Sequence, residues 1–138
     1  MTDSELMKFA ENARKNAYAP YSGYTVGAAL LLKSGEVVTG CNVENASFGA
    51  TICAERAAIA AAIARGSREF CALAIVGGKA GEPATTFFSP CGICRQTLCE
   101  FFREDFRVLV GCGKEIRAFR LSELLPSSFS ADAMEKDL

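Results

Sequence analysis

The fold is decided by one continuous stretch of sequence, Cys53-Ala54-Glu55-Arg56-Ala57-Ala58-Ile59-Ala60-Ala61-Ala62-Ile63-Ala64-Arg65-Gly66. We predict a helix over residues 53–65 that is closed by Gly66. From Ala57 to Ala64 every side chain is apolar, and a helix that is apolar on all sides is normally buried all round. It is either the central helix of an α/β sandwich or a helix whose outer face meets another subunit. The second interpretation is favoured, because a chain this small rarely encloses a helix by itself.

The segments on both sides of this helix alternate between helical and strand patterns. Further helices are predicted over residues 3–16, 91–102 and 122–125, the first of which follows the capping-box spacing of Thr2-Asp3-Ser4-Glu5. Strands are predicted over residues 26–33, 36–41, 70–76, 107–111 and 116–121. Residues 42–52 and 77–90 are predicted loops, and the tail from Pro126 is predicted to be irregular. This order predicts one α/β domain over residues 1–138, a mixed sheet with helices on its faces.

Composition and charge exclude several classes of protein. The 138 residues are 50% hydrophobic and 22% charged, with a net charge of −1, as in an ordinary soluble globular protein. This net charge argues against a protein that binds nucleic acid through contacts with its phosphates. The polar, acidic start of the chain does not resemble a secretory signal, and the apolar run Ala57–Ala64 is too short to span a bilayer. We expect a cytoplasmic protein.

Cysteine and histidine usage narrows the possible chemistry. The chain has seven cysteines and no histidine. An odd number of cysteines without a signal peptide indicates reduced thiols, which in a cytosolic protein more often bind metal than form disulfides. Without histidine, Ser-His and Cys-His nucleophilic pairs are impossible. A general base must then be a carboxylate, a lysine, a tyrosine or a metal-bound hydroxide.

Candidate metal ligands stand at the starts of two predicted helices. The first group is Cys53-Ala54-Glu55, and the second is Pro90-Cys91-Gly92-Ile93-Cys94. A helix places Cys91 and Cys94 on one face, and its positive N-terminal end favours the thiolate form. Three cysteine ligands leave the fourth position of a zinc ion for water, which is the layout of a catalytic site. Glu55 lies within one turn of Cys53, close enough to reach that water.

These residues also have other interpretations. A lone Cys-x-x-Cys also occurs in redox sites and in structural zinc sites, and Glu55 alone is an ordinary helix-start carboxylate. A structural site needs a fourth ligand, for which the candidates are Cys41, Cys71, Cys99 and Cys112. None of the four has a partner at short spacing, and Cys71 and Cys99 are expected to be small core residues. The combination Cys53-x-Glu55 with Pro90-Cys91-x-x-Cys94 matches the signature of zinc-dependent deaminases.

The sequence resembles the small homotetrameric cytidine deaminases that bind zinc through three cysteines. The resemblance runs over nearly the whole chain and includes segments beginning at Ala19, Val26, Asn42, Cys53, Pro90 and Leu124. It implies a three-layer α-β-α sandwich around a mixed five-stranded sheet. It also implies hydrolysis of free cytidine and deoxycytidine to uridine and deoxyuridine with release of ammonia, as in pyrimidine salvage.

The resemblance assigns roles to individual residues. Cys53, Cys91 and Cys94 would hold one Zn²⁺ ion per chain. Glu55 would carry protons between the attacking water, ring N3 and the departing amino group. Arg56 would donate to the cysteine sulfurs and offset their charge, although an ordinary surface ion pair is an alternative.

The resemblance also implies a nucleoside pocket. Asn42 and Glu44 would recognise the ribose 3′-hydroxyl, and Glu44 would repel a nearby phosphate, which favours free nucleosides. Ala54 would contact substrate. Tyr24 and Phe48 would offer aromatic faces to it, each differing by one hydroxyl from many relatives. Phe129 would reach into a neighbouring subunit's pocket.

Three alternatives remain at this level. The nearest is a related zinc deaminase that acts on another aminopyrimidine nucleoside, such as a blasticidin-type antibiotic. A deaminase that edits polynucleotides is disfavoured, because the sequence lacks a basic groove. The alternative of another class is a non-catalytic structural zinc-binding module.

Overall fold

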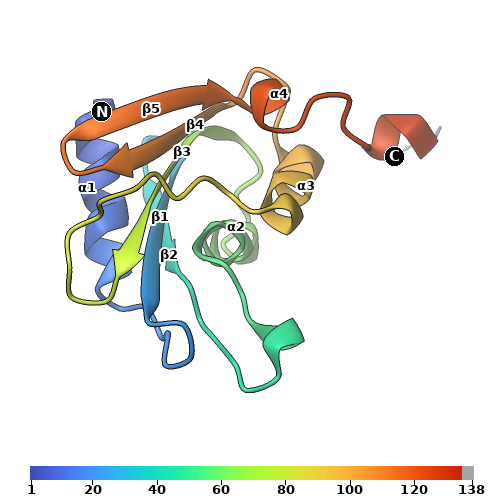
Figure 1. Ribbon diagram of the computed structural model, residues 1–138. Helices are drawn as coiled ribbons and strands as arrows, with labels where there is room; N and C mark the ends of the chain where they lie inside the picture. The colour runs from blue at the N-terminus through green and yellow to red at the C-terminus, as the bar shows by residue number, and fades with distance from the viewer. Residues whose placement is uncertain (135–138) are drawn as a thin grey trace.

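A five-stranded sheet forms the middle layer of the protein, in a computed structural model that describes residues 1–134 (Figure 1). The strands are β1 (Tyr24–Leu32), β2 (Val37–Cys41), β3 (Phe70–Lys79), β4 (Arg107–Cys112) and β5 (Glu115–Arg120), in the spatial order β2-β1-β3-β4-β5. Only the β3–β4 pair is parallel, and the other pairs are antiparallel. The helices are α1 (Asp3–Arg14), α2 (Ala54–Ala64), α3 (Gly92–Phe101) and α4 (Leu121–Leu124).

Alternation along the strands produces two cores, one on each face of the sheet. In β1, Ala28 and Leu30 face the core under α2 and α3, whereas Ala29 faces the core under α1. All three side chains are completely buried. Figure 1 shows α1 on one face and α2 with α3 on the other. The predicted three-layer α-β-α sandwich around a mixed five-stranded sheet is confirmed.

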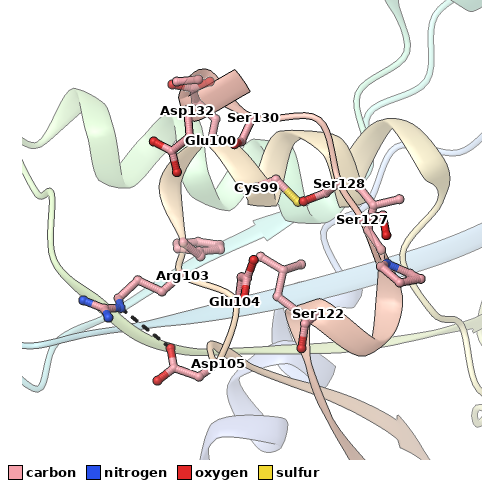
Figure 2. Close-up of a pocket in the computed structure, with 15 residues that line it drawn as sticks. Cys99, Glu100, Arg103, Glu104, Asp105, Ser122, Ser127, Ser128, Ser130 and Asp132 are labelled. Carbon is pink, nitrogen blue, oxygen red and sulfur yellow. Dashed lines mark ion pairs between the residues drawn. The ribbon is translucent and has the colours of Figure 1, made fainter. Parts of the chain in front are cut away.

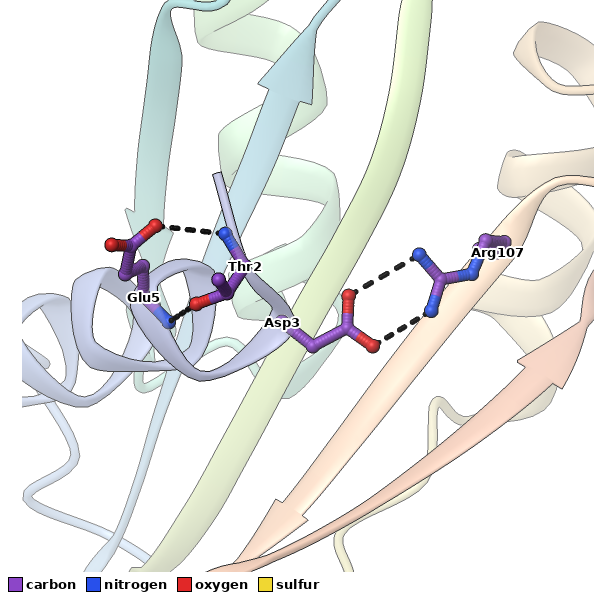
Figure 3. A network of polar contacts seen from close by, with 4 residues as sticks. All are labelled: Thr2, Asp3, Glu5 and Arg107. Atoms are coloured by element: carbon purple, nitrogen blue, oxygen red, sulfur yellow. Dashed lines mark hydrogen bonds and ion pairs between the residues drawn. The ribbon is translucent and has the colours of Figure 1, made fainter.

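The first helix begins at a complete capping box (Figure 3). The Glu5 N–H donates to the Thr2 hydroxyl over 3.1 Å, and the Thr2 N–H donates to the Glu5 carboxylate over 2.8 Å. These two bonds satisfy N–H groups that a helix start otherwise leaves unpaired. Asp3 forms a paired contact with Arg107 at the start of β4, the shorter N–O distance being 2.7 Å. This exposed pair aligns α1 with β4 but adds little stability.

Two glycines allow the helices on opposite faces to touch the β1–β2 hairpin. A Cβ atom at Gly27 would stand 1.9 Å from the Ala10 carbonyl oxygen of α1. A Cβ atom at Gly40 would stand 2.4 Å from the Ala58 nitrogen of α2. The hairpin backbone therefore lies directly against both helices, and α2 is held at a fixed depth over the sheet.

Several sequence-based boundaries differ from the structure. The β1 strand begins two residues earlier than predicted, at Tyr24, and β3 continues to Lys79. The loop over 42–52 contains a 3₁₀ turn, Phe48–Ala50, and the tail contains another, Ala131–Met134. The apolar helix α2 is not covered all round within one chain, because Ala60 and Ala64 are exposed.

The prediction that Cys71 is a core residue is wrong. Its side chain is exposed. Leu31 pairs with Ala72 and Leu32 pairs with Phe70, so that Cys71 is the extra residue of a β-bulge and has no partner in the ladder. Cys99, by contrast, packs against the core as expected.

Within residues 1–134, no helix combines the length and the apolar composition that crossing a bilayer requires.

Candidate active site

Three cysteines from two helix starts converge on one point. Cys53 is the N-cap of α2, Cys91 is the N-cap of α3, and Cys94 lies in the first turn of α3. Their sulfur atoms all lie within 4.8 Å of one another, and those of Cys53 and Cys91 are 3.9 Å apart. In a tetrahedral site with Zn–S bonds of about 2.3 Å, sulfurs stand about 3.8 Å apart. The arrangement therefore fits a zinc ion with three thiolate ligands.

No other cluster of three ligating side chains occurs in the part of the chain that the structure describes. No fourth cysteine or carboxylate joins this one. In particular, Cys99 and Cys112, which were weighed as fourth ligands, lie elsewhere, and Cys112 contacts the Ala84 carbonyl. A zinc ion held here keeps a position free for a small molecule, as in catalytic sites.

Hydrogen bonds within the cluster lower the pKa of the Cys53 thiol and raise the pKa of the Cys94 thiol. The pKa of the Cys53 thiol falls to about 5, first because Cys94 donates a hydrogen bond to its sulfur, and then because Arg56 and Cys91 do so. The pKa of Cys94 is raised because it is the donor to Cys53. The cluster thus stabilises a thiolate at Cys53, which is the form that binds metal.

Arg56 lies beside this cluster, as the sequence suggested. Its Nη2 donates to the Cys53 sulfur over 3.7 Å and to the Thr51 carbonyl over 3.3 Å. Its Nε is buried and has no partner among the described residues. Among the described residues Arg56 forms no ion pair. The guanidinium is placed to offset the negative charge of three thiolates.

Glu55 is buried beside the cysteines. Only 4% of its surface is exposed, although it carries a carboxyl group. The pKa of Glu55 is raised, mainly because burial removes water from the charged form, with a further contribution from the Cys53 thiolate. A buried carboxyl with a raised pKa holds and releases a proton nearer neutral pH than an exposed one.

A cavity of about 240 Å³ opens in front of these groups. Its lining comprises Val26, Asn42, Glu44, Thr51, Ile52, Cys53, Ala54, Glu55, Ile75, Phe88, Ser89 and Cys91. The structure therefore brings Asn42, Glu44 and Ala54 to the same cavity as Glu55 and two of the cysteines. The lining combines two carboxyl groups, two thiols, an amide and apolar side chains.

The Asn42 side chain forms two hydrogen bonds to the main chain of β1, which the sequence did not indicate. Its Oδ1 accepts from the Val26 N–H over 2.8 Å, and its Nδ2 donates to the Tyr24 carbonyl over 2.9 Å. The second Nδ2 hydrogen is left for another acceptor. Asn42 therefore has a structural role in holding β1 in addition to the predicted ribose contact.

Glu44 holds the turn that precedes β1. Its carboxylate accepts from the N–H groups of Tyr21 and Ser22, over 2.9 Å and 3.0 Å, and from the Ser22 hydroxyl. The pKa of Glu44 is lowered, chiefly by the hydrogen bond from the Ser22 hydroxyl. Glu44 therefore stays ionised in the lining of the cavity.

The three predicted aromatic contacts lie outside the cavity lining of the single chain. Tyr24 packs against Phe88 with ring centroids 5.8 Å apart, and Phe48 meets Tyr21 at 5.9 Å. Phe48 is 75% exposed and Phe129 is 61% exposed. Their roles toward substrate stay predictions.

Sequence reasoning missed Phe88, which forms part of the apolar wall of the cavity. A Cβ atom at Gly77 would stand 2.7 Å from the Phe88 ring, so this glycine makes room for it. The signal was present in the sequence: Phe88 stands three residues before Cys91, inside a segment predicted as loop. Its direction depends on packing against β3, which no local pattern shows.

A larger hollow of about 790 Å³ lies between the end of α3, α4 and the tail (Figure 2). Serines and acidic side chains dominate its lining, with an exposed Arg103–Asp105 contact at 3.9 Å. None of Cys53, Cys91 and Cys94 borders it. Its size alone gives no reason to prefer it over the cavity that contains Glu55.

The fold and this cluster define a zinc hydrolase class in which a buried glutamate lies beside a three-cysteine centre. Residues 1–111 match the family described as "Cytidine and deoxycytidylate deaminase zinc-binding region". The chain belongs to this family of zinc-dependent deaminases, and its cofactor is Zn²⁺.

Individual relatives agree over almost the whole chain. It is 45% identical over 130 residues to the cytidine deaminase of Halalkalibacterium halodurans, which covers 94% of this chain and 95% of that protein. The crystal structure of cytidine deaminase from Burkholderia pseudomallei superposes with a TM-score of 0.86 at 42% identity, covering 94% of this chain and 100% of that one. A blasticidin-S deaminase from Bacillus cereus is more distant, at 27% identity over 131 residues, or 93% of this chain and 92% of that protein.

Proposed function

We propose that this protein hydrolyses free cytidine and deoxycytidine to uridine and deoxyuridine and releases ammonia. The observation that carries the proposal is the buried Glu55 carboxyl, which lines a cavity of about 240 Å³ together with Cys53 and Cys91 of the three-cysteine cluster. Membership of the deaminase family supports the same reaction.

Cys53, Cys91 and Cys94 are the proposed zinc ligands. When bound, zinc lowers the pKa of a water molecule toward neutrality and so supplies a nucleophilic oxygen at physiological pH. Arg56 donates to the Cys53 sulfur and draws charge away from it. This donation keeps an otherwise anionic centre effective as a Lewis acid.

Glu55 is the proposed proton carrier. Its carboxylate accepts a proton as the water oxygen bonds to C4 of the base, and it delivers that proton to ring N3. Glu55 then carries the remaining proton of the C4 hydroxyl to the amino nitrogen, so that the C4–N bond breaks, a C4 carbonyl forms and ammonia leaves. The raised pKa of Glu55 suits both directions of transfer, because the proton is held weakly enough to be given up and strongly enough to be taken.

The part of the cavity lined by Asn42 and Glu44 is the proposed ribose site. The free Nδ2 hydrogen of Asn42 and the ionised Glu44 carboxylate offer a donor and an acceptor for the 3′-hydroxyl. A 3′- or 5′-phosphate near Glu44 would meet like charge. The proposed substrate is therefore a nucleoside rather than a nucleotide.

The proposed working unit is a homotetramer with active sites shared between subunits, acting in cytoplasmic pyrimidine salvage. Ala60 and Ala64 leave α2 partly uncovered, and Phe129 is exposed at the end of the tail. Both features support burial against further copies of the chain. Tyr24, Phe48 and Phe129 are proposed to complete the aromatic walls around the base in that assembly.

The test is an absorbance assay with cytidine, deoxycytidine, CMP, adenosine and blasticidin S. We expect turnover of the two cytidine nucleosides, at least tenfold slower turnover of CMP, and none of adenosine. Turnover of blasticidin S in place of cytidine would select the antibiotic-deaminase alternative. Zinc binding without release of ammonia from any of these compounds would select the structural zinc module.

A further inference from the structure

One arginine beside the cysteines ties together segments that come from different parts of the chain. The Arg95 guanidinium donates from Nε to the Pro90 carbonyl over 2.7 Å and from Nη1 to the Leu124 carbonyl over 2.6 Å. Its Nη2 lies 3.3 Å from the Ser89 hydroxyl. The planar guanidinium group thus donates to three acceptors, two in the segment Ser89-Pro90 and one at Leu124, the end of α4.

The first segment leads directly to a proposed zinc ligand. The Pro90 carbonyl belongs to the peptide unit that contains the Cys91 nitrogen, so a bond to this oxygen fixes the plane of that peptide. Ser89 and Cys91 both line the cavity. Holding Ser89 and Pro90 therefore sets the direction in which the Cys91 sulfur projects.

The second segment is the end of α4, which leads to the tail. Carbonyls in the last turn of a helix lack intrahelical partners, and the Arg95 fork supplies one to Leu124. The next residue, Gln96, donates to the Phe129 carbonyl over 2.8 Å. Two adjacent residues of α3 therefore hold the region from α4 to Phe129 against the cysteine-bearing helix.

We propose that Arg95 is a positioning residue that fixes Cys91 by locking Ser89 and Pro90 to the end of α4. The inference rests on the proposed function, since it concerns the same zinc site. Arg95 acts through Cys91 and touches no substrate. A lysine cannot take its place, because one ammonium group cannot reach acceptors on opposite sides of a planar fork.

The experiment measures how fast a chromogenic chelator removes zinc from the purified, zinc-loaded protein. Arg95→Met and Arg95→Lys should release zinc about tenfold faster than the parent, as for other residues that orient a metal ligand. Arg103→Met is the matched control, because the Arg103 side chain is 93% exposed, and it should release zinc at the parent rate. Gln96→Ala loosens only the Phe129 contact and should also leave zinc release unchanged.

Thermal melting of the metal-free proteins separates positioning from general stability. If Arg95→Met and Arg95→Lys melt earlier than the parent but release zinc at its rate, Arg95 is only a structural residue and the inference is overturned. If Arg95→Met does not fold, Arg95→Lys decides the question, because it keeps the aliphatic stem and the charge. If the parent protein turns over cytidine and the Arg95 variants release zinc at the parental rate, only the inference about Arg95 is contradicted. If the Arg95 variants release zinc faster but the parent protein has no deaminase activity, only the proposed reaction is contradicted.

Discussion

The sulfur atoms of Cys53 and Cys91 lie 3.9 Å apart although 38 positions separate the two residues in the chain. The distance is set by the side-by-side placement of the starts of α2 and α3 on one face of the sheet. Neither helix contains a complete set of zinc ligands. The metal site therefore depends on the folded sandwich as a whole.

Removal of a single cysteine from the cluster should abolish zinc binding. Cys91→Ala and Cys94→Ala should each lose the metal, whereas the parent should hold about one zinc per chain. Elemental analysis after gel filtration measures both. Cys99→Ala is the matched control, since Cys99 shares α3 with Cys94 but packs against the core. Loss of zinc from Cys99→Ala, or its retention in Cys94→Ala, would contradict the assigned ligand set.

Glu55→Gln should keep zinc and fold but lose turnover. The amide fills the same volume and cannot carry a proton, so the rate should fall by about 10² to 10⁴. Steady-state assays on zinc-quantified protein check this. Glu100→Gln, an exposed change on α3, should retain parental activity. Retention of more than about a tenth of the rate by Glu55→Gln would refute its role as the proton carrier.

Asn42→Ala and Glu44→Ala should differ in how they impair the protein. Asn42→Ala removes two part-buried hydrogen bonds, to the Val26 N–H and the Tyr24 carbonyl, so it should lower the free energy of unfolding by about 1–2 kcal/mol as well as raise KM. Glu44→Ala, nearer the surface, should mainly raise KM. Chemical denaturation and kinetics with cytidine and free cytosine separate the two effects. Equal turnover of cytosine and cytidine by the parent would remove the ribose assignment.

Protonation of Glu44 should release the turn at Tyr21 and Ser22. Because its folded-state pKa is lowered, its bonds stabilise the fold above the unfolded-state pKa and are lost as the pH falls through the folded-state value. The Ser22 amide resonance should shift with a midpoint below the ordinary glutamate value of about 4.3. In Glu44→Gln that transition should vanish. A midpoint at or above the ordinary value would contradict the hydrogen bonding described.

The local sequence predicted the elements and the cysteine site but not features that depend on strand register. Cys53 and the Cys91–Cys94 pair could be placed because helix starts follow local signals and spacing. Cys71 was misplaced because its apolar surroundings resemble a buried strand, whereas the bulge depends on pairing with β1. Phe88 was missed for a related reason, since its position depends on contact with Gly77.

Light scattering should find a tetramer, and mixed tetramers should reveal whether Phe129 serves a neighbour. A Glu55→Gln chain with an intact Phe129 should restore some activity to a Phe129→Ala chain with an intact Glu55. Burial of the exposed α2 face would favour assembly at roughly 25 cal/mol per Å² of apolar surface, before the cost of association. A stable, active monomer would contradict the shared-site proposal. Absence of rescue in verified mixed tetramers would confine Phe129 to its own subunit.

The close approach of both helix layers to one hairpin has a consequence for recognising distant members of this fold. Gly27 pairs with Cys41 and Gly40 pairs with Ala28, so the two glycines occupy adjacent rungs of the ladder, one beneath each helix. Neither takes part in chemistry, and any side chain at either position would collide with a main-chain atom. The two glycines therefore mark what the scaffold requires and the cysteines mark what the chemistry requires, so a chain of this fold that keeps the first without the second shares the shape alone.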